Sequence, residues 1–277
     1  MKEKQKIKNN QGICKLTKKE GAFVKSHIIP QAFTQKIVRN EPFHQPMENG
    51  QYKKYWTSWY DPKLVVREGE DILAELDSWA ATTLRSNKLV WGVLDNNKED
   101  HLKKEDINIF HEDNGLRTIT NIDTQKLRRF CLSLLWRSAA TELPEFDNIQ
   151  LPNDDLERLR RILISEEVDS TTFYPSIMMQ FSTIDKGDTH ITAPFKDTLT
   201  ISLNNGKSRL LSFFRFYFNG LIIHIYASPT DGFGKLNIGS DPDLYLLTKD
   251  YYSSREKTLS EQLLKDYADE YIKNQMS

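Results

Sequence analysis

The sequence has only two cysteines, Cys14 and Cys131, among 277 residues. Two cysteines are too few for a disulfide framework and fit a reducing compartment, so we expect a cytoplasmic protein. No apolar run approaches the roughly 20 residues of a membrane-spanning helix, and no apolar segment typical of a secretory signal follows the first lysines. The sequence therefore predicts a soluble chain without a membrane partner.

Neither sign of charge is in excess, because 38 basic residues face 39 acidic ones and the formal net charge is −1. Overall charge therefore gives no indication of a nucleic-acid partner. The first 25 residues differ, since they hold eight lysines and only two glutamates. Such a basic arm is typical both of a phosphate-binding segment and of a solvated terminus, and both interpretations stay open. The candidate nucleic-acid-binding residues are Lys15, Lys18, Lys19 and Lys25.

Aromatic residues are abundant, with 14 Phe, 11 Tyr and 5 Trp, and they argue against disorder. Helical periodicity predicts helices over 31–38, 71–84 and 124–141, one from Asn153 onward, and an amphipathic closing helix over 258–273. From residue 171 the period changes to about two. This change predicts strands over 177–184, 190–193, 199–203, 210–218 and 221–226, and Asn219-Gly220 is typical of a hairpin turn. The sequence thus indicates an α+β fold.

Three regions follow from this pattern. Residues 1–90 would form an N-terminal module with a basic arm, in which residues 12–30 make a hairpin that turns at Gly21. Residues 91–170 would form a helical middle. Residues 171–277 would form an antiparallel β-sheet with the closing helix. Cys131 lies on the apolar stripe of helix 124–141, so we expect a buried, unreactive side chain.

The segment with the clearest chemical meaning is Ser26-His27-Ile28-Ile29-Pro30, which follows Cys14. A histidine at the end of a hairpin is typical of a metal-dependent HNH nuclease, where it acts as general base beside a divalent cation. His27 is therefore the candidate catalytic residue. A Mg²⁺ or Mn²⁺ ion would need nearby oxygen or nitrogen ligands, and the candidates are Asp77, Glu75 and His44.

Several motifs, in order, resemble a widespread bacterial family of HNH-like proteins of poorly defined function. The family pattern runs Cys-x-x-Cys, Ser-His-Ile-Ile-Pro, Leu-Leu-Cys-x-x-Cys-Glu, a Phe-x-Leu-Ser-Leu-Leu-Trp-Arg-Ala helix, a Glu-x-x-Arg-x-x-Leu helix and Tyr-Pro. The chain is similar to it over most of residues 13–226, at Ser26–Pro30, Phe130–Ala139, Leu156–Leu163, Tyr174-Pro175 and Phe216–Gly220. The resemblance implies a treble-clef, ββα-metal (HNH-like) module at the N-terminus.

The chain departs from this family at the zinc-binding cysteines. Thr17 stands at the second cysteine of the first pair. With the second pair placed on Ile72–Ser78, its cysteines become Ala74 and Asp77, and the glutamate becomes Ser78. The module is therefore degenerate and no structural zinc is expected. We expect Leu76 and Trp79 to fill the space that zinc would occupy.

Three hypotheses on function remain open. The first is a zinc-less HNH-like endonuclease that acts on nucleic acid, DNA rather than RNA, in bacterial antiphage defence or a mobile element. The second is a catalytically lapsed HNH-like subunit that binds nucleic acid or a protein partner in a defence complex. The third is a structural or regulatory partner. Under each of them Arg137 should be bound to a carboxylate or to backbone carbonyls, because an unpaired buried guanidinium is too costly.

Overall fold

The computed structural model describes residues 10–34, 43–46, 52–90, 102, 107–111, 114–165, 170–182, 192–202, 207–218, 220–227, 233–254, 256–258, 261–262 and 265. Helices and strands are both well represented there, so the predicted α+β class is confirmed. Within these ranges no helix has the length and apolar character needed to cross a membrane.

The N-terminal sheet has three antiparallel strands in the order β1-β2-β5. They are β1 (Gln11–Ile13), β2 (Glu20–His27) and β5 (Tyr60–Val66). The predicted hairpin is present, but its predicted turn is wrong, because Gly21 lies within β2 and pairs with Gly12. The chain turns earlier, where the Lys18 amide donates to the Cys14 carbonyl at 2.9 Å and Lys18 has a φ of 60°.

Helix α2 (Arg67–Ser86) follows β5 directly. Its buried residues Leu73, Leu76, Ala80 and Leu84 recur every three or four positions and face the N-terminal sheet. The helix begins four residues before the predicted 71–84 segment, with Glu68 and Glu70 in the first turn, where the helix dipole favours acidic side chains.

Residues between β2 and β5 form short elements. A 3₁₀ helix η1 (Gln31–Phe33) stands at the start of the predicted helix 31–38, and residues 35–38 lie outside the described ranges. Strands β3 (Phe43–Pro46) and β4 (Tyr52–Tyr55) pair as an antiparallel hairpin.

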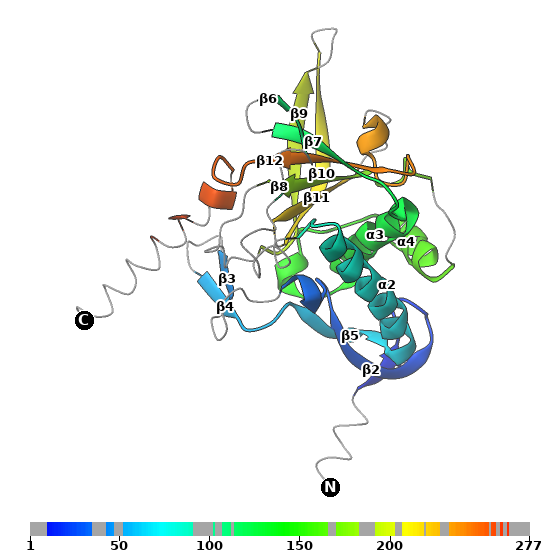
Figure 1. Cartoon of the computed structure of the whole chain (residues 1–277). Helices are drawn as coiled ribbons and strands as arrows, with labels where there is room; N and C mark the ends of the chain where they lie inside the picture. Colours follow the sequence, from blue (N-terminus) through cyan, green and yellow to red (C-terminus); the bar gives the residue numbers. More distant parts are fainter. Residues whose placement is uncertain are drawn as a thin grey trace, which may run out of the picture.

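Helix α3 (Thr124–Ala140) is buried along nearly its whole length, as the long apolar stripe predicts. The Asp123 carboxylate caps it by accepting the Lys126 amide at 2.8 Å. A short 3₁₀ turn, η4 (Pro144–Phe146), separates it from α4 (Asn153–Ser165). Helix α3 contacts α2, α4 and strand β11, so it lies between the two sheets (Figure 1).

The large sheet has seven strands in the order β6-β7-β12-β8-β11-β10-β9. Their bounds are β6 (Asn108–His111), β7 (Asn114–Ile119), β8 (Ser176–Phe181), β9 (Phe195–Ser202), β10 (Ser208–Phe218), β11 (Leu221–Tyr226) and β12 (Leu244–Lys249). All neighbours pair antiparallel except β12 and β8, which are parallel. The predicted strands β8, β9, β10 and β11 pair antiparallel as expected, and the parallel pairing of β12 with β8 makes the whole sheet mixed.

The sheet also takes strands from a region that was predicted to be helical. Strands β6 and β7 come from residues 108–119, where the sequence has no clear period, and β12 was not predicted. Each is short and depends on partners far along the chain, as β12 does on β7 and β8. Residues 192 and 193 of the predicted strand 190–193 are not in a strand, and most of the predicted helix 258–273 lies outside the described ranges.

One hydrophobic core joins the N-terminal module, the helices and the large sheet. It includes Cys14 at one end of the chain and Leu246 at the other. Phe214, Phe216 and Phe218 share the face of β10 that lies in this core, as their alternation predicts, while Phe213 and Tyr217 belong to clusters on the other face. The stack of Phe33 on Phe218, with ring centres 4.8 Å apart, links the module to the sheet.

Candidate functional site

Strand β2 ends at the Ser26-His27 pair, and the two side chains lie on opposite faces of the N-terminal sheet. Ser26 pairs with the buried Asp61, and its own side chain is almost fully buried. His27 pairs with Tyr60, which is exposed, and the two rings meet edge to face at 6.2 Å. Because side chains alternate along a strand, Ser26 faces the helices and His27 the outer surface.

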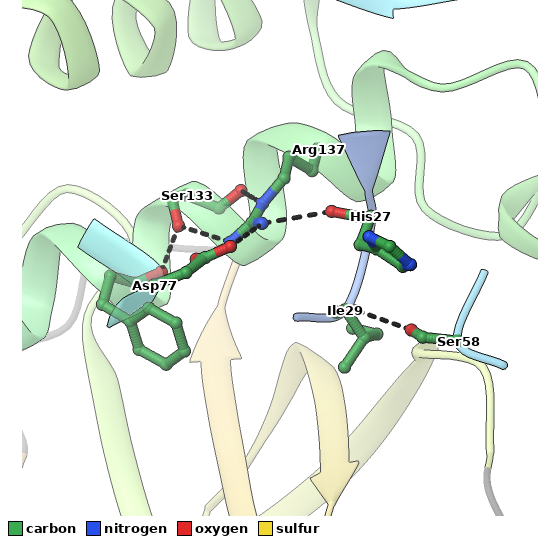
Figure 2. A network of polar contacts seen from close by, with 7 residues as sticks. His27, Ile29, Ser58, Asp77, Ser133 and Arg137 are labelled. Atoms are coloured by element: carbon green, nitrogen blue, oxygen red, sulfur yellow. Dashed lines mark hydrogen bonds and ion pairs between the residues drawn. The ribbon is translucent and has the colours of Figure 1, made fainter. Parts of the chain in front are cut away.

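The inner face holds a network centred on Arg137 of α3, which Figure 2 shows from close by. Its guanidinium binds both oxygens of Asp77, from α2, at 2.8 Å each. It also donates to the His27 carbonyl at 3.1 Å, the Ser133 hydroxyl at 3.0 Å and the Ser133 carbonyl at 3.3 Å. All five N–H donors of the guanidinium therefore have an acceptor, and the prediction that Arg137 is bound in this way is confirmed.

His27 joins this network through its backbone, because its carbonyl accepts from Arg137 while its imidazole points away from the guanidinium (Figure 2). The Nε2 atom is buried and has no hydrogen-bond partner among the described residues. Burial lowers the pKa of His27, the charges of Lys25 and Arg137 lower it further, and the Asp77 charge opposes them. The imidazole is therefore held in its neutral form at neutral pH.

Glu70, which the sequence reasoning missed, lies in the first turn of α2 beside the same network. Burial raises its pKa, a rise that the nearby Ser26 hydroxyl and Arg137 charge oppose. Its Oε2 atom is buried and, like the Ser26 hydroxyl, makes no hydrogen bond of normal geometry. The signal that could have found it is spacing, because Glu70 and Asp77 are seven residues apart and so share one face of the helix.

Asp77 and Glu75, the two predicted metal ligands whose side chains are described, each lie beside a basic side chain. Both oxygens of Asp77 are engaged by Arg137. Glu75 is 79% exposed and lies 3.9 Å from the Lys126 ammonium, and His44 is in β3, where its side chain is not described. The described part of the chain holds no group of three or more His, Cys, Asp or Glu residues suited to a metal ion.

The Cys14 turn packs against the start of α2 rather than its middle. The Thr17 amide donates to Cys14 Sγ at 3.3 Å, and a Cβ atom added at Gly69 would lie 2.8 Å from that sulfur. Ala74 is exposed and Asp77 binds Arg137, so neither lies beside Cys14 as the sequence prediction required. The residue of α2 that approaches the Cys14 sulfur closely is Gly69.

The four lysines predicted to bind nucleic acid lie around the N-terminal module, mostly beside carboxylates. Lys15 pairs with Glu142 at 2.8 Å, Lys18 with Glu157 at 3.8 Å, and Lys19 with Glu68 at 2.7 Å. Lys25 instead places its ammonium 3.8 Å from the centre of the Tyr60 ring. The predicted positive surface is therefore interrupted by acidic side chains.

Cys131 and His224 are packing residues. Cys131 is fully buried, which raises the pKa of its thiol to about 12, so the predicted inert role is confirmed. His224 stacks on Phe213 with ring centres 4.1 Å apart. Burial and the neighbouring Arg215 lower the pKa of His224 to about 3.

Comparison of the chain with protein-family models, with curated proteins and with solved structures found no match in any of the three.

Proposed function

We propose that the chain is a catalytically lapsed HNH-like protein that acts as a nucleic-acid-binding subunit. The observation that carries this proposal is the Arg137–Asp77 ion pair. The Arg137 guanidinium engages both oxygens of Asp77, the carboxylate that the sequence predicts as a ligand for the cation.

The HNH-like part of the proposal is supported by the order and contacts of the N-terminal elements. The Cys14 turn, the β2–β5 pair and α2 follow one another, and the turn lies against the first turn of α2. The contact between Cys14 and Gly69 suggests a new register for the family pattern Leu-Leu-Cys-x-x-Cys-Glu, at Leu64–Glu70. In this register the two cysteines become Val66 and Gly69, and the glutamate is retained as Glu70.

In that register the missing zinc is replaced by packing. Cys14 is fully buried, and Val65 lies against the same side of Gly69 as the sulfur. Four cysteine ligands would hold a structural zinc, whereas Cys14, Thr17, Val66 and Gly69 offer one thiol. Apolar contact is then what holds the turn to the helix, and the module would keep its shape without metal.

The lapse of catalysis is supported by the position of the candidate groups. Ser26, which precedes the histidine, offers a neutral hydroxyl instead of a carboxylate, a weak ligand for a hard cation. The His27 ring lies on the opposite side of β2 from the Asp77 carboxylate. The Ser26 hydroxyl and the Asp77 carboxylate therefore do not combine with the His27 ring into a site for a divalent cation.

The test is a parallel assay of cleavage and binding. Supercoiled plasmid, single-stranded DNA and RNA would be incubated with the protein and Mg²⁺ or Mn²⁺, with gel shift from the same tubes. We expect a salt-sensitive shift without cleavage, because lysine–phosphate contacts release counterions. Absence of any shift on all three substrates would overturn the proposal and leave the protein-partner hypothesis.

Endonuclease activity is the second candidate function, and two buried polar atoms support it. Among the described residues, His27 Nε2 and Glu70 Oε2 are buried and make no hydrogen bond of normal geometry, and a neutral imidazole is the form that a general base requires. This candidate predicts metal-dependent cleavage that His27→Ala and Glu70→Gln both abolish. The matched control is Asp71→Asn, an exposed carboxylate of α2 that is not a candidate ligand, and it should leave cleavage unchanged.

A further inference from the structure

We propose that the outer face of the N-terminal sheet binds single-stranded nucleic acid, with a base stacked on Tyr60 and the flanking phosphate held by Lys25. This inference rests on the proposed function and names its contact site and its substrate class. Tyr60 and Lys25 belong to β5 and β2, the paired strands that present His27 on the same face.

Tyr60 supplies the stacking surface. Tyr60 is 41% exposed and is the first residue of the edge strand β5, where it pairs with His27 at the end of β2. The edge-to-face contact with the His27 ring fixes the orientation of the phenol ring, so little conformational freedom is lost when a base stacks on it. An exposed aromatic side chain held in a fixed orientation is the feature that single-strand-binding surfaces share.

Lys25 supplies the cation. The pairing of β2 with β5 shifts register between Val24 and Ser26, and the extra residues of this irregularity, 62–64, lie on β5 opposite Lys25. The Lys25 side chain is exposed there. Within the described ranges Lys25 has no carboxylate partner, unlike Lys15, Lys18 and Lys19. Among the described residues, Lys25 is therefore the one of the four lysines whose charge no acidic side chain neutralises.

The present contact between the Lys25 ammonium and the Tyr60 ring is compatible with ligand binding. A cation–π contact at an exposed site is weaker than the stacking of a base on an aromatic ring. A base can therefore displace the ammonium from the ring, and the ammonium then moves to the adjacent phosphate. A duplex offers no such exchange, because its bases are already stacked on one another.

The experiment measures fluorescence anisotropy of a labelled 20-nucleotide oligothymidine and of a labelled 20-base-pair duplex, with the full-length protein. We expect tighter binding of the single strand and a roughly ten-fold rise in Kd for Tyr60→Ala. Tyr60→Phe should keep the wild-type Kd, because the ring remains. Lys25→Ala should reduce the slope of log Kd against log salt by about 0.7, the value for one phosphate contact on a single strand.

Two matched controls lie on other elements. Tyr252→Ala removes a tyrosine that is 59% exposed, and Lys235→Ala removes a lysine whose ammonium lies 5.0 Å from the Tyr245 ring centre. Both should bind like wild type. Circular dichroism of each variant verifies that it is folded before its Kd is compared.

The outcomes separate the two proposals. If wild type binds neither probe nor any RNA, the proposed function itself fails. If wild type binds but prefers the duplex, or if Tyr60→Ala changes Kd no more than Tyr252→Ala, the site assigned here is wrong while the proposed function stands.

Discussion

Removal of the Asp77 carboxylate tests the central role given to the Arg137 network. The guanidinium is 1% exposed and the Asp77 side chain 19% exposed, so their contact is well shielded from water. Asp77→Ala deletes two of the five acceptors and leaves an uncompensated buried charge. Breaking a buried pair in this way costs about 3–5 kcal/mol, and we expect about 3 because Asp77 lies near the surface.

This loss is large against a total free energy of unfolding of about 5–15 kcal/mol. At about 2–4 °C per kcal/mol for a chain of this size, it corresponds to a fall in Tm of roughly 6–12 °C. The measurement is urea and thermal denaturation followed by circular dichroism. The double variant Asp77→Leu with Arg137→Met should be less destabilised than Asp77→Ala alone, because it leaves no unpaired charge.

The matched control is Asp71→Ala on the same helix. Asp71 is 64% exposed and lies 3.6 Å from the Arg67 guanidinium, so its removal should change the free energy of unfolding by less than about 0.5 kcal/mol. Equal losses for Asp77→Ala and Asp71→Ala would refute the reasoning. They would mean that the remaining acceptors, His27 and Ser133, are enough to hold Arg137.

Three further predictions concern other buried positions. Gly69→Ala should lower the free energy of unfolding by about 1–2 kcal/mol in chemical denaturation, because overpacking against Cys14 exceeds the gain of about 1 kcal/mol in helix propensity. In a Cys14→Ala background the same substitution should raise the free energy of unfolding. Glu70→Gln should be more stable than wild type at pH 7, because the raised pKa of Glu70 makes wild type lose stability as pH rises. This difference in stability should vanish towards pH ~4. His224→Leu should make the free energy of unfolding less dependent on pH in acid. Because the pKa of His224 is about 3 in the folded protein, the wild type loses up to ~1.4 kcal/mol of stability per pH unit as pH falls from ~6.5 towards 3.

Chelation provides a test of the metal question. If packing holds the Cys14 turn, EDTA should leave Tm unchanged at any incubation time, and added Zn²⁺ should not raise it. A Tm that falls with EDTA and recovers with Zn²⁺ would contradict the replacement of zinc by the contact between Cys14 and Gly69.

The long, strongly patterned elements could be predicted from the sequence. Helix α3 and the β10–β11 pair each carry a period that is set by neighbours close in the chain, and both lie within one or two residues of the predicted bounds. Strands β6, β7 and β12 could not be predicted in this way. They have six residues or fewer and are strands because distant partners pair with them.

The sequence by itself determined that Arg137, on the apolar face of a core helix, had to meet acceptors, because burial of a free guanidinium is too costly. Only the tertiary structure decided that the carboxylate is Asp77, that His27 contributes its carbonyl rather than its ring, and that Glu70 lies beside them. Residues of β2, α2 and α3 approach one another at this network. The position at which α2 begins, Arg67, decides which of its side chains face β2. The sequence pattern shows which face of an amphipathic helix is apolar, but it does not show how far the helix is rotated or shifted along its axis relative to a neighbouring strand.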